Sequence, residues 1–233
     1  METLARQLIG VGLYTIPEAA RLTGVPAPTV RRWAFGYKQS KGGAQRTHEA
    51  IWKSQLPRID GKAALCFLDL VEIRVIQALL HDGQSWKQVR RIGDGAAKLF
   101  RTERPFSSLK FKTDGVRIYN ELSQANGDAA LVEPATFQIA MREVIKPFLH
   151  DLDYGESGEA TRWWPKGNGR WAVVIDPARC FGRPIISGSG VPTAVLKAAF
   201  DAEGQDAATV ARWYEMPKAA VLKAVEFERQ LAA

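Results

Sequence analysis

The chain has 233 residues, of which 46% are hydrophobic and 24% charged, with a formal net charge of +7 and a pI of about 9.5. This composition is typical of a globular protein and excludes a largely disordered chain, a collagen-like repeat and a disulfide scaffold. The apolar runs are far shorter than the roughly 18 residues of a membrane span, and the N-terminus lacks a signal-peptide pattern. We therefore expect a cytoplasmic protein without a membrane partner.

The positive charge is concentrated at the start of the chain. Residues 1–104 hold 17 Lys and Arg against 9 Asp and Glu, whereas 105–170 hold 8 against 9 and 171–233 hold 7 against 7. A localised excess predicts an anionic partner, although a solvated basic surface without a ligand would have the same composition. The same three ranges are the expected domains: a basic N-terminal domain, a central β/α connecting and dimerisation region, and a C-terminal trihelical domain.

The two cysteines, Cys66 and Cys180, have apolar neighbours and are expected to be buried and reduced. No Cys or His spacing predicts zinc, and we expect neither a metal nor a cofactor.

A helix-turn-helix is predicted near the N-terminus. Thr15-Ile-Pro-Glu18 is a capping box that begins a helix over 17–22, Gly24 suits its C-terminus, and a second helix follows over 27–34. The second helix of such a motif can lie in the major groove of DNA. A plain helical hairpin with solvated arginines is the alternative.

A basic loop over residues 37–46 follows, and a wing-like hairpin is predicted over 56–68 around the turn Asp60-Gly61. Asp69 is expected to cap a helix over 70–80. Ser85 is expected to cap another helix that runs from Trp86 to Ile92, or as far as Phe100.

Four segments carry a resemblance to a known family: Tyr14-Thr-Ile-Pro-Glu-Ala-Ala-Arg-Leu-Thr-Gly-Val25, Thr29-Val-Arg-Arg-Trp33, 67–74 and 82–89. Together they resemble the DNA-binding head of MerR-type regulators. The resemblance covers about residues 12–100 and implies a recognition helix and a phosphate-contacting wing. The candidate DNA-binding residues are Thr15, Pro28, Thr29, Arg31, Arg32, Tyr37, Lys38, Arg46, Arg58 and Lys62. Typical members continue into a long dimerisation helix, whereas Pro105 stops any helix here, so dimerisation must use another device.

Two more hairpins are expected in the middle of the chain. One covers 106–120 around Asp114-Gly115, and the other pairs 160–165 with 170–175 and includes Trp163 and Trp171. Between them, the apolar stripe of a helix over 135–145 would be core or a subunit interface.

The last third predicts a short strand over 184–187 and helices over 193–202, 207–214 and 217–231. The expected three-helix core consists of Val195, Leu196, Ala199, Phe200, Val210, Trp213, Tyr214, Val221, Leu222, Val225 and Phe227.

Gly182-Arg-Pro184, Ser189-Gly-Val-Pro-Thr193 and 207–227 resemble an antitoxin-associated domain of unknown function, over about residues 172–230. The resemblance implies a VapB-like type II antitoxin whose toxin is a PIN-type ribonuclease. The expected fold is α+β and mainly helical, with a MerR-like winged helix-turn-helix, a small central β-hairpin region with one helix, and a trihelical homeodomain-like unit.

The resulting functional expectation is an antitoxin that neutralises its toxin by direct binding and represses its operon by binding operator DNA. It would act as a homodimer and in a toxin–antitoxin hetero-oligomer. Because the trihelical segment has no net charge, it is better suited to protein contacts than to phosphates. The candidate toxin-binding or dimerisation residues are Arg179, Phe181, Arg183, Ile185, Arg212 and Trp213.

A MerR-like regulator that responds to a small effector is the alternative, and it would need a concave apolar site. An enzyme is not expected, because the carboxylate pairs Asp151/Asp153 and Glu226/Glu228 have no partnering His or Lys motif.

Overall fold

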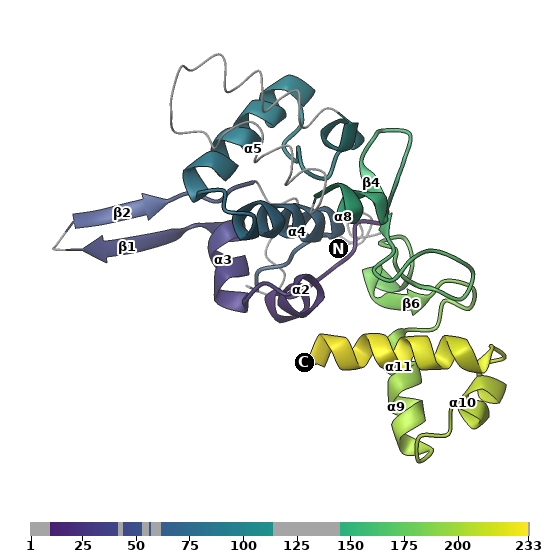
Figure 1. The fold of residues 1–233 in the computed structure, drawn as a ribbon. Helices are drawn as coiled ribbons and strands as arrows, with labels where there is room; N and C mark the ends of the chain where they lie inside the picture. Colours follow the sequence, from purple (N-terminus) through teal and green to yellow (C-terminus); the bar gives the residue numbers. More distant parts are fainter. Residues whose placement is uncertain (1–9, 42–43, 53–55, 57–61, 114–144, 233) are drawn as a thin grey trace, which may run out of the picture. The chain divides into compact units, whose positions relative to one another are not determined.

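The computed structural model describes residues 10–41, 44–52, 56, 62–113 and 145–232. It is α+β and mainly helical, which confirms the predicted class (Figure 1). The chain divides into an N-terminal unit, Thr15–His150 with Tyr154–Ala160, and a C-terminal unit, Thr161–Ala233 with Met1–Tyr14 and Asp151–Asp153. None of the helices in the described ranges is long and apolar enough to cross a membrane.

The predicted helix-turn-helix is present as α2 (Ile16–Thr23) and α3 (Ala27–Phe35). The hydroxyl of Thr15 accepts a hydrogen bond from the Glu18 amide, the Glu18 carboxylate accepts one in return, and Gly24 ends α2 in a left-handed conformation (φ 73°). The apolar side chains Ala19, Leu22, Val25 and Val30 are buried.

The hairpin that follows is not where the sequence pattern predicted it. Strands β1 (Tyr37–Lys41) and β2 (Ala44–His48) pair antiparallel in the segment expected to be a loop. The expected hairpin over 56–68 is wrong in its described part, because Ala63 and Ala64 lie outside any strand and a helix begins at Phe67. Its turn, Asp60-Gly61, lies outside the described residues. The sequence pattern missed the β1–β2 hairpin because its strands are polar, whereas a strand is recognised in a sequence by alternating apolar and polar residues.

Helix α4 (Phe67–His81) forms the core of the N-terminal unit and packs against α2, α3 and α5 (Trp86–Phe100). Its residues Ile73, Val75 and Ile76 are fully buried. Asp69 is not the N-cap but the third residue of the helix, where its carboxylate accepts a hydrogen bond from the amide of the N-cap residue Cys66.

Helix α5 begins at the predicted cap Ser85, which forms a capping box with Gln88. It extends to Phe100 and ends at Arg101, which adopts a left-handed conformation (φ 56°), so the helix stops before Pro105 is reached.

The expected strand over 106–112 is also wrong, because residues 109–113 are helical. The Ser108 hydroxyl accepts a hydrogen bond from the Phe111 amide, a local helix-start contact that outweighs the alternating pattern. The rest of that hairpin, and all but the last residue of the helix expected over 135–145, lie outside the described residues. Helix α8 (Lys146–His150) follows.

The C-terminal unit contains a sheet of order β3-β4-β5-β6, formed by β3 (Leu152–Tyr154), β4 (Ala160–Trp163), β5 (Val173–Ile175) and β6 (Pro184–Ile186). The predicted β4–β5 hairpin is confirmed, with Trp163 opposite Ile175, although β5 is shorter than expected and leaves out Trp171. All three residues of β5 are buried.

Three helices complete this unit: α9 (Thr193–Ala202), α10 (Ala207–Trp213) and α11 (Lys218–Ala232). Helix α11 packs against α9, β5 and β6 (Figure 1). Most of the expected core is buried, but Val195, Trp213 and Leu222 are 43%, 58% and 44% exposed. The prediction assigned every apolar residue to the core, whereas each short helix buries only one face.

Candidate functional site

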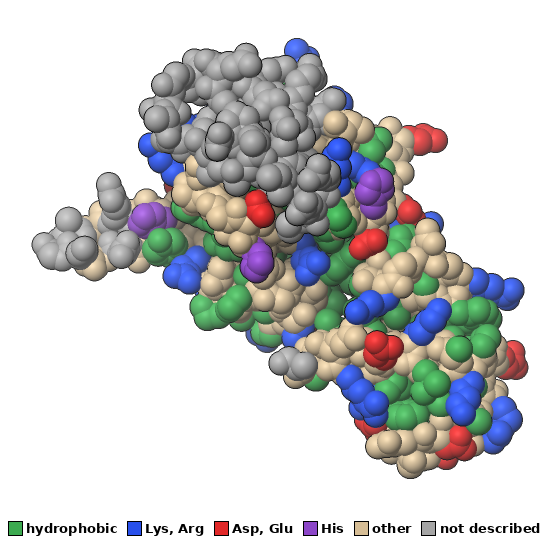
Figure 2. Space-filling model, viewed as in Figure 1, with side chains coloured by type: hydrophobic (Ala, Val, Ile, Leu, Met, Phe, Trp, Pro, Cys, Tyr) green, Lys and Arg blue, Asp and Glu red, His purple; other side chains and the backbone are tan. Residues whose placement is uncertain are grey.

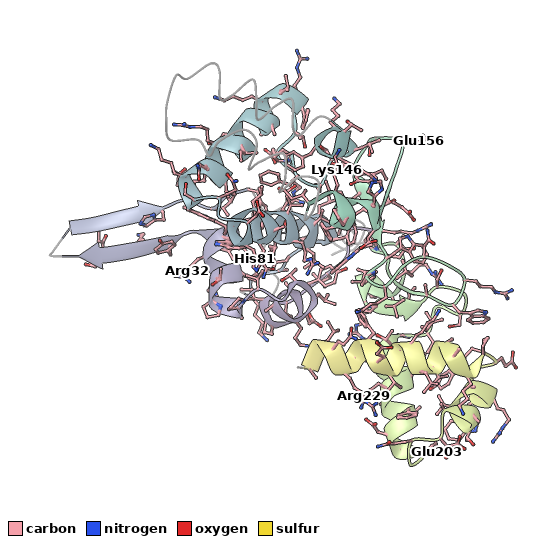
Figure 3. The ribbon with its side chains drawn as sticks, in the orientation of Figure 1. Arg32, His81, Lys146, Glu156, Glu203 and Arg229 are labelled. Carbon is pink, nitrogen blue, oxygen red and sulfur yellow. The ribbon has the colours of Figure 1, made fainter. Side chains whose placement is uncertain are left out.

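Helix α3 presents the first group of candidate DNA-binding residues. Val30 and Ala34 face the core, so the other side of the helix carries Arg31 and Arg32, which are exposed. Pro28 is exposed and Thr29 is half-buried, and the Thr29 hydroxyl accepts a hydrogen bond from Nη2 of Arg32 at 3.2 Å. Figure 3 shows Arg32 on α3, next to the start of β1. The helix therefore offers two guanidinium groups to solvent on one surface.

The β1–β2 hairpin extends from the end of α3 beyond the helices of its unit (Figure 1). Gly36 joins the two elements at φ 68°, and a Cβ there would lie 2.4 Å from the carbonyl oxygen of His48, so only glycine fits. On the hairpin, Lys38 is exposed and Arg46 lies opposite Gln39. This hairpin has the basic character that the prediction gave to a wing, but it lies earlier in the chain than the wing expected over 56–68.

The remaining DNA-binding candidates are not all placed together. Thr15 is exposed, and its hydroxyl is bonded within the capping box of α2. Lys62 is exposed and is a β-bridge residue, and Arg58 lies outside the described residues.

An aromatic cluster lies beside this surface, and of its members only Tyr37 was predicted as a site residue. Trp33 stacks on Trp86 of α5 with ring centroids 5.5 Å apart, and Tyr37 stacks on His48 at 4.4 Å. The guanidinium of Arg90 lies over the Trp86 ring and donates a hydrogen bond to the carbonyl of Glu49. No spacing rule could have found this cluster, because its members come from segments about fifty residues apart.

A buried polar network supports the N-terminal unit behind this surface. The Arg104 guanidinium contacts the Asp69 carboxylate at 2.9 Å and donates to Cys66 Sγ at 3.0 Å, and Trp52 Nε1 donates to Asp69 at 2.6 Å. Burial raises the pKa of the Cys66 thiol to about 12, so the cysteine is a neutral acceptor there.

Glu72 lies in the same core, on α4. Its side chain is completely buried and accepts a hydrogen bond from the Ser107 amide at 2.8 Å. Burial raises its pKa to about 8, more than the Ser107 bond and the Arg104 charge lower it. Glu72 is therefore mostly protonated at neutral pH and acts as a structural group.

The candidate protein-binding residues of the C-terminal unit divide into two groups. Phe181 is 63% exposed, Trp213 is 58% exposed, and Arg183 and Arg212 are exposed. The assignment of Ile185 to an interface is wrong, since it is fully buried in β6. Both Nη atoms of Arg179 donate to the Ser187 carbonyl, at 3.0 and 3.1 Å, so this arginine serves its own unit.

Phe181 is held in an unusual conformation. Cys180 (φ 47°) and Phe181 (φ 55°) are both left-handed and are followed by Gly182 (φ 80°). The turn is held by the Leu13 amide, which donates to the Phe181 carbonyl, and by the Tyr14 hydroxyl, which donates to the Gly182 carbonyl. Cys180 is exposed, contrary to prediction. Left-handed non-glycine residues are costly and are enriched at functional sites.

The C-terminal unit has a surface of mixed character. In Figure 2, the visible face of the C-terminal unit shows hydrophobic side chains surrounded by both basic and acidic ones. Such a surface differs from a basic phosphate-binding patch and is typical of a protein contact.

The geometry therefore defines a two-part protein, with a helix-turn-helix head and a trihelical C-terminal domain. Comparison with known families agrees: residues 12–92 match a family described as "Putative DNA-binding HTH domain", and residues 173–227 match a "Protein of unknown function" family, DUF433.

Two individual relatives extend the likeness to most of the chain. "Putative antitoxin VapB45" of Mycobacterium tuberculosis (strain ATCC 25618 / H37Rv) is 27% identical over 193 residues, covering 79% of this chain and 80% of its own. The crystal structure of Rv2018 from Mycobacterium tuberculosis shares the fold, with a TM-score of 0.72 and 24% identity over 93% of this chain and 99% of that one. These matches confirm the resemblance to VapB-like antitoxins with a helix-turn-helix head.

Proposed function

We propose that this chain is the antitoxin of a type II toxin–antitoxin system and that it represses its own operon by binding operator DNA. The observation that carries the proposal is the exposed Arg31–Arg32 pair on α3 beside a basic hairpin, in a chain similar to a protein named as an antitoxin. In the DNA complex, α3 enters the major groove and the β1–β2 hairpin contacts phosphates, as a MerR-like wing does.

The C-terminal unit supplies the contact with the toxin, a PIN-type ribonuclease. Phe181 and Trp213 are the apolar anchors, because large exposed aromatic side chains dominate the free energy of protein interfaces. Arg183 and Arg212 flank them and suit the carboxylate-rich surface of a metal-dependent ribonuclease. The comparisons favour a regulator over an enzyme.

The chain acts in the cytoplasm as a homodimer, and as a hetero-oligomer once toxin is bound. A two-fold dimer implies an inverted-repeat operator whose half-sites are separated by whole helical turns.

One experiment tests both parts of this function. The chain is co-expressed with the product of the adjacent gene, growth is recorded, and the purified complex is titrated with DNA from upstream of the operon. Growth rescue with a stable complex and a sequence-specific DNA shift are expected. A non-toxic neighbour, or a toxic one whose effect is not relieved, would refute the antitoxin role.

A further inference from the structure

A groove opens in the N-terminal unit where helix α3, the hairpin and helix α5 meet. It is lined by Arg32 and Trp33 of α3, Tyr37 and His48 of the hairpin, and Trp86 and Arg90 of α5. We call it the α3–α5 groove.

Stacked aromatic rings form much of its lining. The Trp33 and Trp86 rings are 5.5 Å apart at an interplanar angle of 25°, and the Tyr37 and His48 rings are 4.4 Å apart at 9°. Because each ring is held by its partner, little side-chain entropy is lost when a ligand packs against them. The groove therefore offers a preformed, partly apolar surface.

Two guanidinium groups lie against those rings. The Cζ atom of Arg32 is 5.9 Å from the centre of the Tyr37 ring, and that of Arg90 is 5.8 Å from the centre of the Trp86 ring. A guanidinium carries five N–H donors, and one described hydrogen bond occupies each group, to Thr29 for Arg32 and to the Glu49 carbonyl for Arg90. Within the described residues neither arginine forms an ion pair, so both groups keep donors for an anion.

The other polar groups of the lining are compatible with a bound anion. Glu49 contributes the one carboxylate among the lining residues, against two arginines. Nε2 of His48 is shielded from solvent and has no hydrogen-bond partner in the part of the chain that the structure describes. The groove therefore combines aromatic faces with two guanidinium groups, which suits a phosphate ester that carries an apolar group.

We propose that the α3–α5 groove seats a phosphodiester of the bound DNA strand. Arg32 and Arg90 donate to the phosphate oxygens, and the deoxyribose packs against Trp86. This inference rests on the proposed function, because α3 and the hairpin, which border the groove, are the elements assigned to DNA. It adds Trp86 and Arg90 to the interface and makes α5 a third contact with the duplex.

The test uses the full chain and a fluorescein-labelled duplex from upstream of its own operon, with the Kd measured by anisotropy over a salt series. Arg90→Gln is compared with Lys98→Gln, which removes the same charge from an exposed position further along α5. Arg90→Gln should weaken binding about tenfold and reduce the salt slope by about one, whereas Lys98→Gln should leave both nearly unchanged. Thermal unfolding confirms that each variant is folded.

A second pair of variants isolates the aromatic contribution. Trp86→Leu should weaken binding without changing the salt slope, because it removes a packing surface and no charge, and Trp86→Phe should restore most of the affinity. The same proteins are titrated with free thymidine monophosphate, followed by tryptophan fluorescence.

The outcomes separate the groove from the function on which it depends. If the wild-type chain does not bind the duplex, DNA binding fails and the inference falls with it. If the wild type binds but Arg90→Gln behaves like Lys98→Gln, the inference is overturned while the function stands. If only the free nucleotide responds to Trp86→Leu, the groove is a small-molecule site and the inference is again overturned.

Discussion

Arg104 reaches Asp69 across 35 residues of chain and contacts its carboxylate at 2.9 Å, with both side chains almost completely buried. Asp69 lies in the first turn of α4, so this ion pair links the core helix to the segment that follows α5. Trp52 and Cys66 complete the network.

Removing one member of the Asp69–Arg104 ion pair should lower the free energy of unfolding more than removing both. Arg104→Met leaves the Asp69 charge buried without its counter-ion and should lower the free energy of unfolding by about 3–5 kcal/mol. The double variant Asp69→Asn with Arg104→Met should lose less, because no charge remains unpaired. Urea unfolding of the three proteins measures the difference. A double variant less stable than Arg104→Met would contradict this account.

Glu72 should make stability depend on pH in a defined direction. Its folded pKa of about 8 lies above the ordinary 4.5, so the folded state retains a proton that the unfolded state releases. The stability that this proton adds is complete below pH 4.5 and is lost as the pH rises to 8. Over that range the free energy of unfolding falls by about 1.4 kcal/mol per pH unit. Glu72→Gln keeps the acceptor for Ser107 and should flatten that decline. Parallel curves for the two proteins would refute a raised pKa.

The Arg31–Arg32 pair should dominate the affinity for DNA. The double variant Arg31→Ala with Arg32→Ala should weaken operator binding about a hundredfold and reduce the salt slope by about two if both contact phosphates. Lys98→Ala with Lys110→Ala removes the same charge from exposed positions of the same unit. Equal losses in the two double variants would mean that α3 has no special role.

Phe181 should contribute to toxin binding and not to folding. Its side chain is 63% exposed and its backbone is left-handed, so Phe181→Ala should leave the free energy of unfolding within about 0.5 kcal/mol. Loss of an aromatic anchor should weaken toxin binding at least about tenfold in calorimetry. Leu109→Ala, an exposed apolar position of the N-terminal unit, is the control. Unchanged toxin affinity would exclude Phe181 from the interface.

The turn that presents Phe181 should depend on the Tyr14 hydroxyl. That hydroxyl donates to the Gly182 carbonyl at 2.8 Å from 168 positions away, so Tyr14→Phe should lower the free energy of unfolding by about 1 kcal/mol. Tyr214→Phe is the matched control, since no hydrogen bond of its hydroxyl occurs among the described residues. The free energies of unfolding obtained from denaturant curves should differ between the two variants by about 1 kcal/mol. Coincident curves would mean that the Tyr14 hydroxyl does not stabilise the turn.

Local signals in the sequence predicted local structure well. The capping boxes at Thr15 and Ser85 placed α2 and α5, because a side-chain cap and the amides it bonds lie within four residues. The hairpin that carries Tyr37 was missed because polar strands have no buried face to reveal their period.

Long-range features could not be read in the same way. The stack of Trp33 on Trp86 depends on how α3 and α5 pack, and no spacing rule encodes that distance. The left-handed Phe181 has no sequence sign at all, since the pattern that marks positive φ is glycine or asparagine. The exposure of Trp213 depends on which face of α10 packs against α11, and the sequence of α10 alone does not determine that face.

The polypeptide leaves the C-terminal unit and enters the N-terminal unit between Tyr14 and Thr15. During synthesis, residues 13 and 14 therefore emerge long before the turn at 180–182 to which they donate hydrogen bonds. The C-terminal unit can be completed only after the N-terminal unit has been synthesised.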